Sequence, residues 1–114
     1  MNDKENILLF PKKIFNLLKK KIHKLNIKCD DDIAFTILTP NDTYKYTIII
    51  NNDIFKNMTK DERMITILHE IAHSIGIIDE EEADRWVLKN LNSEQEFILT
   101  SQWKLRHGYE YKPL

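Results

Sequence analysis

The sequence is poor in glycine and proline, with two glycines and three prolines among 114 residues. Flexible linkers and low-complexity spacers depend on such residues, and the chain shows neither these nor an internal repeat. There is thus no obvious place to divide it. Its length and its 42% hydrophobic content suffice for one modest core. We expect residues 1–114 to form a single domain.

Cysteine and an excess of either charge are missing as well. The single cysteine, Cys29, has no partner for an internal disulfide and no second thiol for a zinc or iron–sulfur cluster, which favours a reducing, cytoplasmic setting. The 17 basic residues nearly balance the 18 acidic ones, for a net charge of −1. No overall field therefore attracts nucleic acid or anionic lipid, and we expect neither as a partner.

Long apolar runs are also absent. No uncharged apolar stretch approaches the roughly 18 residues that a membrane-spanning helix needs. The first ten residues carry acidic side chains before the short run Ile7–Phe10, and no small-residue cleavage site follows. We therefore expect neither a membrane span nor a signal peptide.

The apolar spacing predicts an α+β fold. After Pro11, apolar residues at helical spacing predict a first helix that reaches Leu25, with lysines mainly on its other face. Ile33–Thr39 and Tyr44–Asn51 are rich in β-forming residues and are separated by the turn-forming segment Pro40-Asn41-Asp42. They predict a hairpin with one strand at a sheet edge. We expect helices packed on this short antiparallel sheet.

Capping signals predict three further helices. The N-cap pairs are Thr59 with Glu62, Asp79 with Glu82, and Ser93 with Glu96. The first of these helices should end at Gly76, because glycine readily adopts the left-handed conformation of a helix stop. The last should end near Trp103, followed by an irregular aromatic tail.

The strongest chemical signal lies in the helix that Thr59 caps. His69-Glu70-Ile71-Ala72-His73 is an H-E-x-x-H sequence, and residues four apart project from the same face of a helix. The two imidazoles can therefore bind one metal ion. Glu70 is offset by about 100° from His69, which keeps it out of the ligand set but near a bound water. This is the geometry of a general base, although two metal-free core histidines remain the alternative.

A zinc ion that activates water needs three protein ligands and one open position. On the helix after Asp79, a wheel of about 100° per residue places Glu80 and Asp84 on the apolar side. Glu81 and Glu82 point sideways or away, as solvated first-turn acids do. We therefore predict Glu80 as the third ligand. Asp84, one turn later, can accept the second ring N–H of a ligating histidine and orient it.

These motifs resemble the ImmA/IrrE family of small zinc metallopeptidases. The resemblance rests on L-H-E-I-A-H-S-I-G at Leu68–Gly76 and E-E-E-A-D-R-W at Glu80–Trp86, and it covers about Ile48–Leu91. It implies a zincin-like active-site helix, a zinc ion on His69, His73 and Glu80, and Glu70 as the base. It also implies a proteolytic activity of the kind that relatives on mobile elements direct at repressor-like regulators.

Other metal sites are compatible with parts of the pattern. H-E-x-x-H-x-x-G-x-x-D, with Gly76 and Asp79 at its end, would make Asp79 the third ligand of a metzincin-like protease, but all methionines lie upstream of the site, so the methionine turn of that class is missing. Glu70-x-x-His73 is half of a di-iron motif, but the chain holds no second copy.

The expected activity is hydrolysis of a protein or peptide bound in an extended conformation. Zinc would polarise the scissile carbonyl and activate water, with Glu70 as the proton carrier. One of the two hairpin strands could pair with the substrate backbone. The tail offers His107, Tyr109 and Tyr111 as candidate donors to the tetrahedral oxyanion. The alternative function is a non-catalytic zinc-binding sensor or protein-interaction adaptor.

Overall fold

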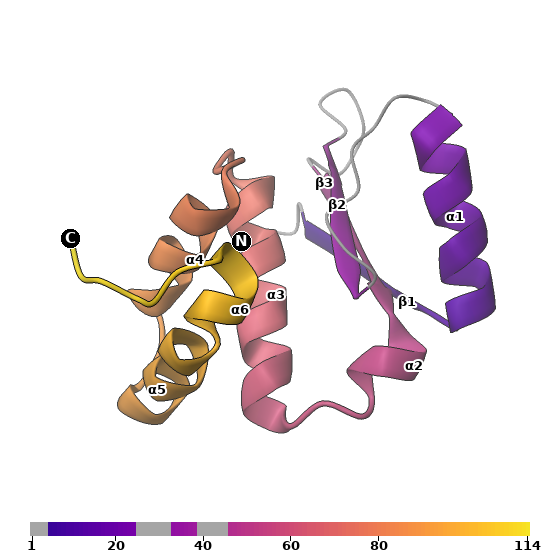
Figure 1. Ribbon diagram of the computed structural model, residues 1–114. Helices are drawn as coiled ribbons and strands as arrows, with labels where there is room; N and C mark the ends of the chain where they lie inside the picture. Colours follow the sequence, from indigo (N-terminus) through magenta and orange to yellow (C-terminus); the bar gives the residue numbers. More distant parts are fainter. Residues whose placement is uncertain (1–4, 25–32, 39–45) are drawn as a thin grey trace.

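The computed structural model describes residues 5–24, 33–38 and 46–114. It has the predicted α+β class, with helices on both sides of a small sheet (Figure 1). In chain order the elements are β1 (Glu5–Phe10), α1 (Lys12–Lys24), β2 (Ala34–Leu38), β3 (Tyr46–Asn51), α2 (Asn52–Phe55), α3 (Lys60–Ser74), α4 (Glu80–Leu88), α5 (Ser93–Ser101) and α6 (Trp103–His107).

The sheet of the described residues is three-stranded and mixed, with β3 between β1 and β2. β2 runs antiparallel to β3, with Thr36 opposite Ile48, which confirms the predicted pairing of these two segments. The expectation of a purely antiparallel sheet is wrong, because β1 pairs in parallel with β3, with Ile7 opposite Ile48. The predicted turn Pro40-Asn41-Asp42 lies outside the described residues.

Strand β1, like the short helix α2, is an element that the sequence pattern did not predict. Its apolar residues follow one another from Ile7 to Phe10, so they lack the alternation that identifies a half-buried strand. Its pairing with β3 joins segments separated by α1 and β2 along the chain. Such a long-range contact leaves no local signature in the sequence.

Helix α1 covers one face of the sheet. Its buried residues Phe15 and Ile22 pack with Phe35 of β2 and Ile49 of β3, and the rings of Phe15 and Phe35 lie 5.1 Å apart. The described part of this helix ends at Lys24, and the predicted end at Leu25 lies outside the described residues. The helix keeps its lysines at exposed or half-buried positions, as the spacing predicted.

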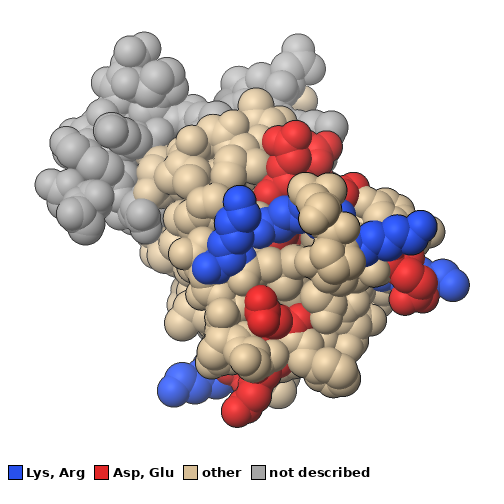
Figure 2. All heavy atoms as spheres, turned by 90° about the vertical axis from the view of Figure 1, so that its left-hand side faces the viewer, with Lys and Arg blue, Asp and Glu red and all other residues tan. Residues whose placement is uncertain are grey.

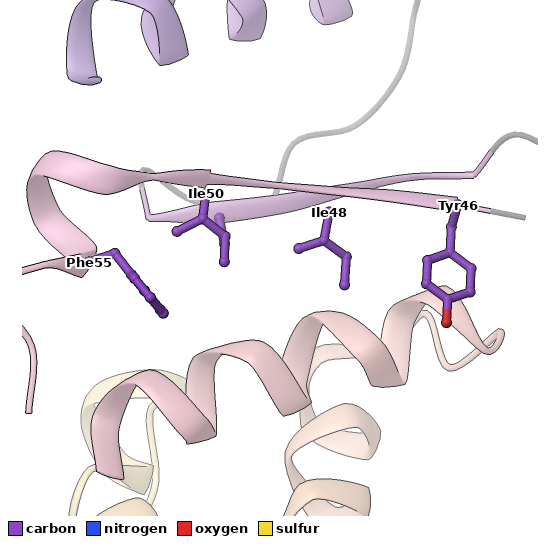
Figure 3. Close-up of a cluster of buried hydrophobic side chains, with 5 residues drawn as sticks. Tyr46, Ile48, Ile50 and Phe55 are labelled. Carbon is purple, nitrogen blue, oxygen red and sulfur yellow. The ribbon is translucent and has the colours of Figure 1, made fainter. Parts of the chain in front are cut away.

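Helix α3 covers the opposite face of the sheet. The alternation along β3 directs Tyr46, Ile48 and Ile50 towards α3, as Figure 3 shows, and Ile67 and Ile71 of that helix pack against them. β3 is therefore buried on both faces, which explains its run of isoleucines. This packing fixes α3 beside the sheet along its length.

Helices α4, α5 and α6 pack on the far side of α3 from the sheet (Figure 1). A third hydrophobic cluster joins Ile65 of α3 to Val87 of α4, Leu99 of α5 and Trp103 of α6. Figure 2 shows this side of the molecule, where basic and acidic side chains are interspersed. The H-E-x-x-H motif thus lies on a helix packed between the sheet and three further helices.

Two predictions about the C-terminal helices need correction. The fourth predicted helix is capped by Asn92 with Gln95, each side chain accepting from the other's backbone, and not by Ser93 with Glu96. Asparagine and glutamine serve these two positions as well as serine and glutamate do, and the two patterns are offset by one residue. The helix also ends at Ser101, and Trp103 begins the separate short helix α6.

None of the helices in the described ranges combines the length and the apolar character that crossing a lipid bilayer requires.

Candidate metal centre

Helix α3 carries both histidines of the motif. It begins at the predicted capping box and ends before the predicted glycine. At the start, Thr59 accepts from the backbone N–H of Glu62 while the Glu62 side chain accepts from that of Thr59. At the end, Gly76 adopts a left-handed φ of 105°, and the N–H of Ile77 donates to the carbonyl of Ala72. This glycine stop leads the chain directly towards α4.

Three potential ligand atoms converge between α3 and α4. The Nε2 atoms of His69 and His73 lie 3.0 Å apart. Oε1 of Glu80, the first residue of α4, lies 2.7 Å from Nε2 of His69 and 3.3 Å from Nε2 of His73. Both histidines are buried, whereas the Glu80 side chain is half exposed. The cluster therefore reaches the molecular surface on the Glu80 side.

The second ring nitrogen of each histidine has an acceptor of its own. Nδ1 of His69 donates to Oδ1 of Asp84 at 2.7 Å, and Nδ1 of His73 donates to the backbone oxygen of Ile77 at 2.7 Å. The Asp84 contact is the one that the helical wheel predicted. Because Nδ1 of each ring carries a proton, a ring that gives up its Nε2 proton presents the Nε2 lone pair to a metal ion.

This arrangement fits a zinc ion. The lone pairs of the three atoms repel one another unless a cation, either a proton on Nε2 of His69 or a metal ion, lies among them. Tetrahedral zinc with nitrogen and oxygen ligands at about 2.0–2.1 Å separates neighbouring ligand atoms by about 3.3 Å. The observed separation of 3.3 Å equals that value, and those of 3.0 and 2.7 Å are shorter, so a bound zinc ion would move the Glu80 carboxylate slightly away from His69. Two imidazoles and one carboxylate are also a ligand set that catalytic zinc sites use.

The pKa values of His69 and Asp84 also indicate that this cluster favours a positive charge. Burial lowers the pKa of the His69 ring, but hydrogen bonds to Asp84 and Glu80 outweigh burial and raise this pKa to about 9. Burial raises the pKa of Asp84, but hydrogen bonds from His69 and Arg106 outweigh it and hold the pKa well below its usual range. Two acids therefore stabilise a positive charge at the position of the His69 ring.

Glu70 lies beside this cluster and accepts a hydrogen bond from a residue of the sheet. It is 1% exposed, and the hydroxyl of Thr36 on β2 donates to its Oε1 at 2.7 Å. Ligand atoms of His69, Glu70 and His73 all lie within 4.8 Å of one another, so this group of described residues could also hold a metal. Oε1 of Glu80 lies within 3.3 Å of both Nε2 atoms, which favours Glu80 as the third ligand. The role of Glu70 as a base stays a prediction.

Asp79, the alternative third ligand, has a different contact. Its Oδ2 accepts from the backbone N–H of Glu82 at 3.0 Å, which makes it the predicted N-cap of α4. The next acid, Glu81, pairs with Arg85 at 3.1 Å, and Glu82 is exposed. Of these four consecutive acids, Glu80 is thus the one with contacts to both histidines.

The three candidate oxyanion donors of the tail also have contacts. Nε2 of His107 donates to Oδ2 of Asp84 at 2.6 Å. A hydrogen bond to Glu81 is the first cause of a raised pKa of Tyr109, and the ring of Tyr111 lies 5.0 Å from that of Trp103. His107 thus contacts Asp84, the residue that hydrogen-bonds to His69. A role for any of the three at an oxyanion stays a prediction.

Two residues that contact the site, Thr36 and Arg106, were not predicted from the sequence. Strand alternation places Thr36 on the same face as Ala34 and Leu38, but nothing local says that this face meets Glu70. Arg106 approaches Asp84 with Nε at 2.7 Å from Oδ2 and with Nη2 at 2.7 Å from Oδ1. Arg106 and Asp84 are 22 residues apart, so no local spacing in the sequence indicates this contact.

The chain matches no family model, no curated protein and no solved structure. The resemblance to the ImmA/IrrE family therefore rests on the two motifs alone.

Proposed function

We propose that the chain is a zinc-dependent endopeptidase of the H-E-x-x-H type with a zincin-like active-site helix. The observation that carries the proposal is the convergence of His69 Nε2, His73 Nε2 and Glu80 Oε1 within 2.7–3.3 Å. The orientation of both rings through Nδ1 supports it, because it leaves both Nε2 atoms able to bind a metal.

The chemistry then divides between the metal and Glu70. Zinc in such a site supplies Lewis acidity, which makes water acidic and polarises a carbonyl oxygen. The Glu70 carboxylate takes the proton from the attacking water and later delivers it to the nitrogen of the leaving amine. The Thr36 hydroxyl holds that carboxylate through Oε1.

The substrate would bind as an extended segment beside β2. In the described sheet β2 is an edge strand and β3 is central, so β2 is the hairpin strand that could pair with a peptide backbone. Thr36 places this strand in contact with Glu70. Backbone pairing selects for unfolded segments more than for particular side chains. A repressor-like regulator with a flexible segment is a substrate of the kind that the motif resemblance implies.

The test combines zinc analysis with a peptidase assay on the wild-type chain and the Glu70→Gln variant. We expect one zinc per chain in both proteins, cleavage of an unfolded protein by the wild type, and a loss of about 100-fold or more in the variant. Glu82→Gln, which changes an exposed acid of α4, is the matched control and should cleave normally. A wild-type protein without bound zinc would contradict the proposal.

A non-catalytic zinc-binding sensor or adaptor is the second candidate. The burial of Glu70, which is 1% exposed, favours it, because a general base must reach water and substrate. A zinc-loaded wild-type chain that cleaves neither unfolded proteins nor candidate repressors would support this second function.

A further inference from the structure

Asp84 is fully buried, and its two carboxylate oxygens receive four hydrogen bonds. Oδ1 accepts from Nδ1 of His69 and Nη2 of Arg106, each at 2.7 Å. Oδ2 accepts from Nε of Arg106 at 2.7 Å and from Nε2 of His107 at 2.6 Å. One side of the carboxylate thus faces the metal centre, and two consecutive residues of α6 hold the rest.

These contacts fix the orientation of the carboxylate. The terminal torsion of an aspartate is soft, so one hydrogen bond to His69 leaves the group free to rotate. Arginine uses two donors in a rigid fork, and this sets the plane of a carboxylate as well as its position. Since His107 donates to the same carboxylate, rotation away from His69 would break several charge-assisted hydrogen bonds.

Helix α6 is itself a firm support. Trp103, at its start, is fully buried among residues of α3, α4 and α5. The ring of His107 lies 4.5 Å from that of Trp103, and Gly108 ends the helix in the left-handed conformation at a φ of 88°. The backbone that carries Arg106 and His107 is therefore anchored in the core.

We propose that Arg106 and His107 are positioning residues of the metal centre: by fixing Asp84 they hold the His69 ring in the orientation that binds the metal. The inference rests on the proposed zinc site and extends it to α6, which no metal-binding motif includes. The effect passes from α6 through Asp84 to Nδ1 of His69, and so sets the direction in which Nε2 points.

An ion pair that merely joined α4 to α6 would have a different signature. Its loss would lower the free energy of unfolding, but it would leave the zinc affinity and the ligand geometry of the folded protein unchanged. Positioning residues must alter both properties of the folded state. Metal affinity and the absorption spectrum of bound Co²⁺, measured far below the melting temperature, therefore separate the two roles.

The experiment compares wild type with Arg106→Gln and His107→Leu, using zinc titration against a chromophoric chelator and Co²⁺ spectra. We expect both variants to bind zinc about 10–100-fold more weakly and to shift the Co²⁺ bands. Arg106→Lys and His107→Gln, which each keep a donor, should lose less affinity. They also provide the measurement if the first pair fails to fold, as judged by circular dichroism.

Arg85→Gln is the matched control. Arg85 contacts Glu81, the backbone oxygen of Lys112 and the ring of Trp103, so its loss disturbs the same region along a path that does not include Asp84. Wild-type zinc affinity and Co²⁺ spectra in all four Arg106 and His107 variants would overturn the inference and leave the zinc site intact. The same losses in Arg85→Gln would also overturn it. A wild-type chain that does not bind zinc would overturn the proposed function and this inference together.

Discussion

At the scale of single residues, four neighbouring acids have different contacts because their side chains point in different directions. Asp79 caps α4, Glu80 contacts both histidines, Glu81 pairs with Arg85, and Glu82 is exposed. These residues have similar chemistry and adjacent positions. Their roles differ because each step along the helix rotates the side chain by about 100°.

This difference predicts the effect of amide substitutions. Glu80→Gln should weaken zinc binding substantially, by about tenfold or more, because a neutral amide replaces one of three ligands. Glu82→Gln should bind zinc like the wild type. Chelator-competition titrations of both variants provide the measurement, and the assignment is wrong if the Glu80 variant keeps wild-type affinity while Asp79→Asn or Glu81→Gln loses it.

Thr36 allows a second prediction at this scale. Thr36→Val keeps the side-chain shape but removes the hydroxyl that donates to Glu70. One hydrogen bond is worth about 1 kcal/mol, so turnover should fall by roughly fivefold while zinc affinity stays unchanged. Thr47→Val on β3 is the control, because Thr47 lies opposite Ile37 on the sheet face that α1 covers. Equal effects of the two substitutions on turnover would exclude a specific role for Thr36.

At the scale of elements, the connection between α3 and α4 brings the candidate ligands together. His73 is followed by the left-handed Gly76, then by Ile77, whose carbonyl accepts from the His73 ring, and then by the α4 cap at Asp79. A turn this short can bring Glu80 back to His69 only because Gly76 reverses the chain at once.

Substitution of Gly76 tests this turn. A Cβ at Gly76 would meet no atom within 4 Å, so the cost comes from the backbone conformation alone. We expect Gly76→Ala to lower the free energy of unfolding by about 1–2 kcal/mol. Gly76→Asn should cost less, because asparagine tolerates the left-handed region. Urea denaturation of the zinc-free proteins provides the comparison, and an alanine variant as stable as wild type would disprove the expected strain.

At the scale of the whole molecule, the candidate metal centre joins two packing layers. The candidate ligands His69 and His73 belong to α3, which packs on the sheet, and Glu80 belongs to α4 on its other side (Figure 1). The unfolded chain holds no such preformed site. Zinc bound there would therefore stabilise the fold as well as support chemistry.

Removal of zinc should lower the melting temperature. A ligand present at about 1,000 times its dissociation constant stabilises the folded state by about 4 kcal/mol, which corresponds to a shift of roughly 10 °C or more for a domain of this size. Thermal unfolding with and without a chelator measures this difference, and His73→Ala should show no chelator effect. An unchanged melting curve after verified removal of zinc would contradict the coupling.

The sequence by itself determined the local features of the site. The Thr59 capping box, the glycine stop at Gly76 and the Asp79 cap each depend on residues within one or two turns, and the structure has all three. The same holds for the two histidines one turn apart. Helical period and capping chemistry operate over short distances along the chain, so a pattern of letters suffices to predict them.

Only the tertiary structure decided which distant segments support that site. The parallel pairing of β1, the contact of Thr36 with Glu70 and the hold of Arg106 and His107 on Asp84 each join elements far apart in the sequence. Such contacts depend on the position and angle at which whole elements pack, which the combined burial of many side chains sets. The spacing of a few residues along the sequence does not specify how whole elements pack. These contacts could therefore be identified only from the packed arrangement of the helices and the sheet.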